Sequence, residues 1–317
     1  MRTIGTIERL DPALDSIISP DAVVEIVADE FEWTEGPLWV ESQKMVLFSD
    51  IPQNAVFKWS EEGGLEPYLK PSGYTGSRQR GGELGSNGLL LDDEGNLVLC
   101  QHGDRRLATM LAPLDAPKSD FQTIADRWDG KKFNSPNDAI FYKGDFYITD
   151  PAYGMEKQFD DPARETPFCG VYRVDPNGNV SLLTDSLSRP NGIAFSPDGN
   201  FLFVANSDPT RAIWTKYAVK SETGGDDRVV TIADGKILYD ATSLTATEPG
   251  LPDGMKIDSK GNIFATGPGG VFIFNLDGKL LGKIKLPNPS SNCALTGDEK
   301  TLFVTNDMYL LRIKLRK

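Results

Sequence analysis

One short phrase recurs along this chain and constrains its fold more than any other feature. It reads SNGLLLDDEGNLVLC at Ser86–Cys100, PNGIAFSPDGNFLFV at Pro190–Val204 and PDGMKIDSKGNIFAT at Pro252–Thr266. Weaker copies begin with EGPLW at Glu35, PNDAIF at Pro136 and SNCAL at Ser291. Repeats spaced by about 40–60 residues, each with several short strands, are typical of radial blades, which must bury their faces against one another. The repeat therefore predicts a single domain over residues 1–317, with residues 1–20 as an N-terminal lead-in.

Strand signals dominate between these phrases, and long helical periodicity is nearly absent. Short runs rich in Val, Ile, Phe and Leu, such as Phe201–Ala205 and Val271–Asn275, are separated by glycine-containing turns such as PDGN and LDGK. Aligning the copies gives six antiparallel four-stranded blades, so we expect an all-β, six-bladed β-propeller around a central tunnel. The alternating apolar segment Ala22–Ala28 is placed to complete the last blade as its outer strand. Two polar insertions, Ser72–Gly85 and Gly154–Pro167, are expected to be loops at the rim of the tunnel.

Composition and charge exclude some partners. The 317 residues carry a formal net charge of −13, which argues against nucleic acid as a partner because phosphate binding requires a basic surface. No run is long and apolar enough to span a bilayer. The start lacks the apolar stretch of a signal peptide, so we expect a soluble protein, cytoplasmic as given or periplasmic if a leader was removed. A monomer or weak dimer is expected. Of the three cysteines, Cys100 and Cys293 lie in apolar strand patterns and are expected to be buried free thiols.

The first polar residue of each repeat is the candidate for chemistry. In a propeller the innermost strands line the tunnel, so equivalent opening residues should converge on one mouth. These residues are Glu35, Asn87, Asn137, Asn191, Asp253 and Asn292. All of them supply oxygen, which suits calcium, magnesium or manganese better than zinc, and the chain has a single histidine.

A purely structural interpretation competes with this one. Asn-Gly and Asp-Gly pairs are common in turns because these residues tolerate a left-handed backbone. That interpretation does not account for Glu35, a poor turn residue, at the equivalent position of the first repeat.

The motifs together resemble those of the gluconolactonase, regucalcin and senescence-marker-protein family of six-bladed propellers, whose distant relatives include paraoxonases and diisopropyl fluorophosphatase. The resemblance covers nearly the whole chain. It rests on EGPLW at Glu35, CQHGDRR at Cys100, NSPND at Asn134, TDPAYG at Thr149, RPNGIAFS at Arg189 and LPDGMKID at Leu251.

The resemblance implies one divalent cation at the tunnel mouth and a set of site residues. The implied metal ligands are Glu35, Asn137, Asn191 and Asp253. The cation is expected to be calcium, with magnesium, manganese and zinc as alternatives. Asp253 is implied as the catalytic base, with His102 as the alternative base because an imidazole titrates near neutrality. Candidates for substrate contact are Asn87, Asp138 and Tyr153.

The expected activity is hydrolysis of a cyclic ester, a small-molecule sugar lactone such as gluconolactone. A bound cation would polarise the carbonyl, and a carboxylate would activate water. Two alternatives stay open: a hydrolase of other lactones or of phosphotriesters at the same site, and a non-enzymatic propeller that binds calcium or a partner. The arginine pair of shorter sugar lactonases has no clear counterpart, and Arg78, Arg80 and Arg189 are candidates for it.

Overall fold

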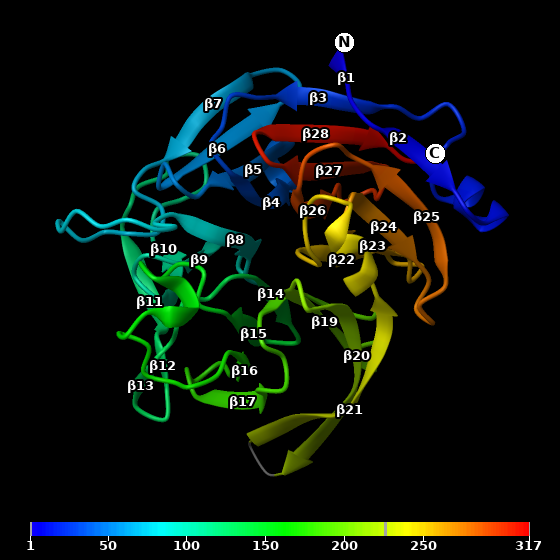
Figure 1. The fold of residues 1–317 in the computed structure, drawn as a ribbon. Coiled ribbons are helices and arrows are strands. Elements are labelled where there is room, and N and C mark those ends of the chain that lie inside the picture. The colour runs from blue at the N-terminus through cyan, green and yellow to red at the C-terminus, as the bar shows by residue number, and fades with distance from the viewer. Residues whose placement is uncertain (1, 225–226, 317) are drawn as a thin grey trace.

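The computed structural model describes residues 2–224 and 227–316. Six antiparallel sheets stand around one axis and form a six-bladed β-propeller (Figure 1). Helical structure in the described residues is limited to four short 3₁₀ segments. The fold predicted from the repeated phrase is therefore confirmed.

The strands of each blade follow one another from the tunnel outward. Blades one and two contain β4 (Thr34–Val40), β5 (Met45–Asp50), β6 (Ala55–Ser60) and β7 (Gly64–Leu69), then β8 (Ser86–Leu91), β9 (Leu97–Gln101), β10 (Arg106–Met110) and β11 (Phe121–Ala125). A small hairpin, β12 (Arg127–Trp128) and β13 (Lys131–Lys132), precedes blade three. Blades three and four contain β14 (Ala139–Tyr142), β15 (Asp145–Asp150), β16 (Gly170–Val174) and β17 (Val180–Thr184), then β18 (Pro190–Phe195), β19 (Phe201–Asp208), β20 (Arg211–Gly224) and β21 (Asp227–Asp240).

The last two blades are completed by the N-terminal segment. Blade five contains β22 (Met255–Ile257), β23 (Ile263–Gly267), β24 (Gly270–Phe274) and β25 (Leu280–Lys285), and blade six contains β26 (Ser290–Leu295), β27 (Thr301–Asn306) and β28 (Tyr309–Lys314). Strand β3 (Val24–Ala28) pairs antiparallel with β28 and closes the ring, as the apolar pattern at Ala22–Ala28 predicts.

The prediction of four strands in every blade is wrong for blades five and six. Strand β2 (Thr6–Arg9) pairs with β25, and β1 (Arg2–Thr3) pairs with β3, so these two blades have five strands each. Residues 1–20 were expected only as a lead-in segment, whereas they supply β1 and β2. Their hydrogen bonds cover sheet edges that would otherwise be open.

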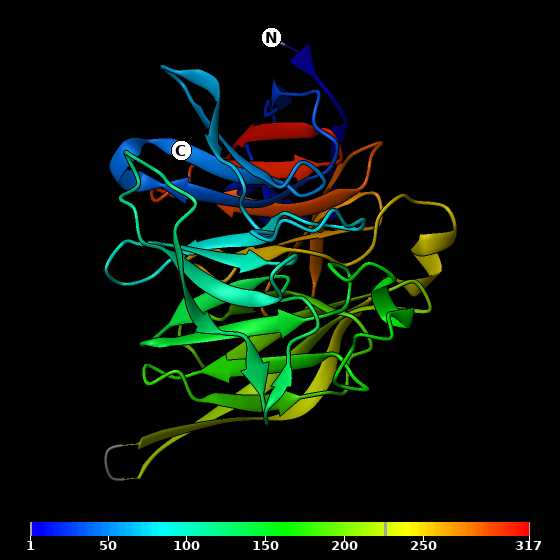
Figure 2. The same cartoon turned by 90° about the vertical axis from the view of Figure 1, so that its left-hand side faces the viewer.

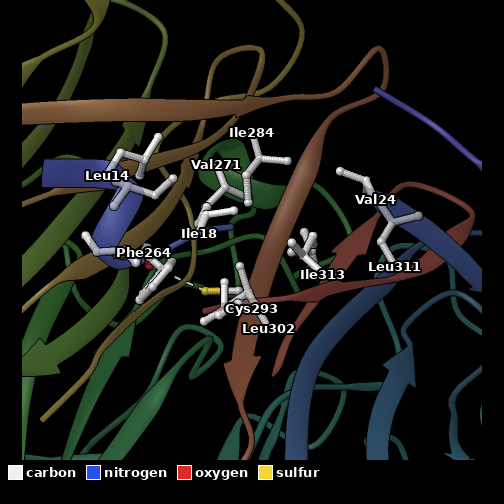
Figure 3. Close-up of a cluster of buried hydrophobic side chains, with 14 of the residues drawn as sticks. Leu14, Ile18, Val24, Phe264, Val271, Ile284, Cys293, Leu302, Leu311 and Ile313 are labelled. Atoms are coloured by element: carbon white, nitrogen blue, oxygen red, sulfur yellow. Dashed lines mark hydrogen bonds between the residues drawn. The ribbon is translucent and has the colours of Figure 1, made fainter. Parts of the chain in front are cut away.

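The hydrophobic core is divided among the interfaces between blades. Each of six buried clusters of described residues lies between two neighbouring blades. The cluster between blades five and six contains Leu302 and Leu311 of blade six together with Val271 and Ile284 of blade five, and Leu311 lies beside Val24 of β3 (Figure 3). The buried Cys293 lies there too, with its Sγ 3.4 Å from the carbonyl oxygen of Phe264, and all three cysteines are free and buried. Each blade therefore depends on its two neighbours to bury its apolar faces.

Two features depart from the compact ring. The hairpin β20–β21 extends well beyond the other blades (Figure 1). The short helices η3 (Gln158–Asp160) and η4 (Thr242–Ala246) lie on the same side of the propeller, as the green and yellow coils of Figure 2 show. No helix of the described residues is long and apolar enough to cross a membrane.

Candidate active site

The glycine that follows the first polar residue of a repeat allows neighbouring inner strands to approach closely. A Cβ atom on Gly192 would lie 2.2 Å from the carbonyl oxygen of Asp253, and one on Gly88 would lie 2.9 Å from that of Asn137. The amide of Gly88 donates a hydrogen bond to this Asn137 oxygen at 2.8 Å. Neither glycine has a positive φ, so the Asn-Gly pairs at these positions are not left-handed turns. Their glycines bring consecutive blades together at the tunnel.

The close approach gathers polar residues of all six blades around one cavity of about 490 Å³. Of the residues predicted to form the site, the cavity is lined by Glu35, Asn87, Asn137, Tyr153, Asn191 and Asp253. The predicted metal ligands therefore lie at one mouth, although they come from segments far apart in the sequence. The sixth repeat differs, because Asn292 packs against Gly254 and its Nδ2 lies 3.5 Å from Oδ2 of Asp138. Asn292 does not line the cavity.

Several oxygens at this mouth are buried without a partner among the described residues. Oδ1 of Asn87, Oδ1 of Asn191 and Oδ1 of Asp253 have no hydrogen-bond donor. Buried polar atoms in proteins are normally paired, because leaving one unpaired costs about 1–3 kcal/mol. Three unpaired acceptors in one cavity point to a ligand with positive charge or with donors.

The two carboxylates of the set are also uncompensated. Burial raises the pKa of Glu35 to about 8, and the charges of Asp138 and Glu83 act in the same direction, against the hydrogen bond from the Gly36 amide at 3.0 Å. Burial and the nearby charge of Glu35 raise the pKa of Asp253 well above its usual value. Neither carboxylate has a salt bridge to a described cationic side chain. Two buried acids of this kind are most stable when a cation lies between them.

The donor chemistry fits a hard divalent cation. Glu35 and Asp253 supply anionic oxygens, and Asn137 and Asn191 supply amide oxygens that are neutral, which is the mixture that calcium accepts among its about six to eight ligands. The described residues contain no cluster of three or more His, Cys, Asp or Glu side chains that could hold a metal, so any cation site here depends on amide oxygens. Such a site favours calcium, magnesium or manganese over zinc.

Two of the residues singled out from the sequence lie just outside the cavity lining. His102 is fully buried, with Nδ1 3.1 Å from Oε2 of Glu83. Asp138 is also buried, and its Oδ1 accepts a hydrogen bond from the amide of Ala139 at 2.9 Å. Neither His102 nor Asp138 lines the cavity, so both would act on a bound ligand only through the residues that line it.

Sequence reasoning missed other residues of the wall, among them Trp33, Glu83, Ser207 and Glu248. Glu83 belongs to the insertion 72–85, and Glu248 follows η4, so neither occupies an equivalent position in the repeats. The one signal that could have found them was the expectation that long rim loops reach the tunnel mouth. The arginines considered from the sequence lie elsewhere: Arg78 and Arg80 line a separate cleft, and Arg189 stacks on the ring of Phe159 at 4.5 Å.

Comparison with known proteins gives a consistent assignment. The sequence model of the SMP-30/gluconolactonase/LRE-like region matches residues 33–307. A gluconolactonase of Zymomonas mobilis is 37% identical to this chain over 320 residues, which cover 99% of this chain and 87% of the relative. A pentonolactonase of Haloferax volcanii is 26% identical, covering 89% of this chain and 84% of the relative. The solved structure of a gluconolactonase of Xanthomonas campestris superposes with a TM-score of 0.81 at 27% identity, over 100% of this chain and 98% of that one. The chain belongs to the SMP-30/gluconolactonase/LRE-like family.

Proposed function

We propose that this protein is a divalent-cation-dependent lactone hydrolase that acts on a sugar lactone such as gluconolactone. The observation that carries the proposal is the pair of buried, uncompensated carboxylates of Glu35 and Asp253, beside the unpaired Oδ1 atoms of Asn87 and Asn191. The activities named for the relatives from Zymomonas mobilis and Haloferax volcanii give the substrate class.

The residues that would hold the cation are Glu35, Asn137, Asn191 and Asp253. When bound there, a divalent cation polarises the lactone carbonyl and stabilises the negative charge that develops on its oxygen. The cavity volume of about 490 Å³ leaves room for a sugar-sized ring beside this set, because ligand pockets commonly span about 300–1,000 Å³.

The chain supplies the proton transfers. Hydrolysis adds one water to the carbonyl carbon, breaks the ring C–O bond and yields a hydroxy acid. Asp253 lines the cavity, and its buried Oδ1 has no hydrogen-bond donor among the described residues, so we assign to this carboxylate the role of accepting the proton of the attacking water and returning it to the ring oxygen. Tyr153 lines the same wall, with its hydroxyl committed to the carbonyl oxygen of Ser207 at 2.9 Å, so its ring can bound the substrate while its proton is engaged.

The test is a chelation and restoration experiment. Acid release from gluconolactone is followed with a pH indicator, with the spontaneous rate subtracted, after chelation and after separate addition of calcium, magnesium, manganese or zinc. We expect chelation to abolish the catalysed rate and at least one of calcium, magnesium and manganese to restore it. Unchanged activity in a protein shown to be metal-free would exclude cation dependence. Cation binding without hydrolysis of any lactone would instead indicate a non-enzymatic propeller.

A further inference from the structure

The charges of the cavity wall are all of one sign. Among the described residues that line it, four are carboxylates and none is Lys, Arg or His; the carboxylates are Glu35, Glu83, Glu248 and Asp253. We infer that Glu83, oriented by His102, and Glu248 determine specificity by binding the hydroxyl groups of uncharged lactones and repelling lactones that carry an anionic group. This inference rests on the proposed function and assigns it a substrate class and residues.

Glu83 is fixed in its position by a buried imidazole. The side chain of His102 is fully buried, and its Nδ1 lies 3.1 Å from Oε2 of Glu83, whose own side chain keeps 29% exposure toward the cavity. Neither ring nitrogen of His102 makes an aligned hydrogen bond to any described residue, Glu83 included. The close contact between the buried ring and the carboxylate restricts the orientations that the Glu83 side chain can adopt.

Residues of the two rim insertions pack around His102 and Glu83 on the side away from the cavity. A Cβ atom on Gly154 would lie 2.4 Å from Cβ of His102, so the second insertion covers the imidazole directly. Arg80 of the first insertion donates hydrogen bonds to the carbonyl oxygens of Gly103, at 3.1 Å, and Gly154. The arginine thus joins both insertions instead of pointing into the cavity.

Glu248 carries the second free carboxylate of the wall. Glu248 follows η4. Its Oε2 packs closely against Gly269, because a Cβ atom added to that glycine would lie only 2.6 Å from this oxygen. Lys283 acts on it electrostatically, but the lysine donates its hydrogen bond to the carbonyl oxygen of Pro268 at 3.1 Å and does not line the cavity.

The charge balance gives the substrate class. A divalent cation offsets Glu35 and Asp253, which leaves the two negative charges of Glu83 and Glu248 facing the substrate. Carboxylates bind hydroxyl donors through strong, charge-assisted hydrogen bonds, so a polyhydroxylated neutral lactone is favoured. A phosphate or a carboxylate on the substrate would lie close to these like charges, at a cost of about tenfold or more in kcat/KM for each wall charge. The hydroxy acid formed by hydrolysis is itself an anion, so the same charges promote its release.

The experiment compares three lactones: gluconolactone, gluconolactone phosphorylated on its terminal hydroxyl, and δ-valerolactone, which has no hydroxyls. For Glu83→Gln and Glu248→Gln we expect the ratio of kcat/KM for the phosphorylated lactone to that for gluconolactone to rise about tenfold each. Glu83→Ala should raise KM for gluconolactone about tenfold, with no change in KM for δ-valerolactone. His102→Gln should raise KM for gluconolactone by less than Glu83→Ala does, and it should leave the cation content of the protein unchanged.

The matched control is Glu62→Gln, which removes the same charge from an exposed turn between β6 and β7 and should leave all three ratios unchanged. Cation content and melting temperature confirm that each variant is folded. Ratios that stay at the wild-type value in both Gln variants would overturn the inference. An equal loss of kcat on all three lactones in Glu83→Ala would make Glu83 a catalytic residue and also overturn it. If the wild-type protein hydrolyses no lactone at all, the proposed function fails and the inference fails with it.

Discussion

Gly192 lies so close to Asp253 that the carbonyl oxygen of Asp253 occupies the space of a side chain at position 192. A Cβ atom there would be 2.2 Å from this oxygen, although the two residues belong to different blades. The contact sets the separation of β18 and β22, and with it the separation of the side chains of Asn191 and Asp253. The absence of a methyl group is thus part of the geometry of the site.

Gly192→Ala tests this relationship. The added methyl group must push β18 away from β22, and a misplacement of about 1 Å can cost roughly 100-fold in rate, so we expect a fall of that order in kcat/KM together with weaker cation binding. Steady-state kinetics and calcium titration measure both. Gly63→Ala is the control, because the nearest atoms there are side-chain oxygens of Ser60 and Glu66 at 3.0 and 3.3 Å, which can move. Equal kinetics in the two variants would show that the close approach has no role in the site.

Asp253→Ala removes one anionic oxygen donor and the proposed base. We expect kcat to fall by at least about 100-fold, the usual contribution of a general base, and the calcium content of the purified protein to fall as well. Asp277→Ala deletes an exposed carboxylate in the turn after β24 and should change neither quantity. A variant at position 253 with nearly normal turnover would contradict the assignment of the base.

The stability of the chelated protein should decrease with rising pH. Burial raises the pKa of Glu35 from 4.5 to about 8, so the folded cation-free protein keeps a proton that the unfolded chain releases. The folded state therefore loses stability relative to the unfolded chain as pH rises from about 4.5 to 8. A cation binds the ionised carboxylate, so the increase in melting temperature caused by excess calcium should grow across the same interval.

Thermal unfolding at several pH values, with chelator or with calcium, measures this dependence. Glu35→Gln cannot ionise, and its cation-free form should show a smaller decrease of stability with pH than the wild-type protein. A calcium effect that is the same at both ends of the interval would contradict the prediction.

Closure of the ring can be tested at Leu311, which is fully buried and pairs with Ile26 of β3. Leu311→Ala leaves a cavity between the last two blades, and we expect the free energy of unfolding to fall by about 2–5 kcal/mol. Leu111→Ala truncates a leucine that is 56% exposed and should change it by less than about 0.5 kcal/mol. Urea unfolding followed by tryptophan fluorescence compares the two, and equal midpoints would argue against a tightly packed closure.

The sequence allowed the ring and most of the cavity to be predicted because both follow from repetition. Equivalent residues of a repeat occupy equivalent places, so Glu35, Asn191 and Asp253 could be placed at one mouth without any knowledge of distances. Asn292 shows where this reasoning fails. Its position in the repeat is equivalent, but its side chain is drawn toward Asp138 and away from the cavity.

The remaining residues could not be predicted because they do not repeat. Glu83 and Glu248 reach the cavity from segments that have no counterpart in other blades, and the contact of Glu83 with His102 could not be foreseen although His102 itself was singled out. The long hairpin β20–β21 was missed for a different reason. Its outer half is polar and rich in glycine, which resembles a loop, and it forms strands because the two halves satisfy each other's backbone hydrogen bonds.

The pairing of β3 with β28 has a consequence for synthesis. Glu25 and Arg312, whose side chains bond across this pair at 2.7 Å, are 287 positions apart, so the partner of β3 is synthesised long after β3 itself. Residues 2–28 therefore emerge long before the sheets that they complete, and the apolar edge of a half-made protein stays open to its neighbours until β28 has been synthesised.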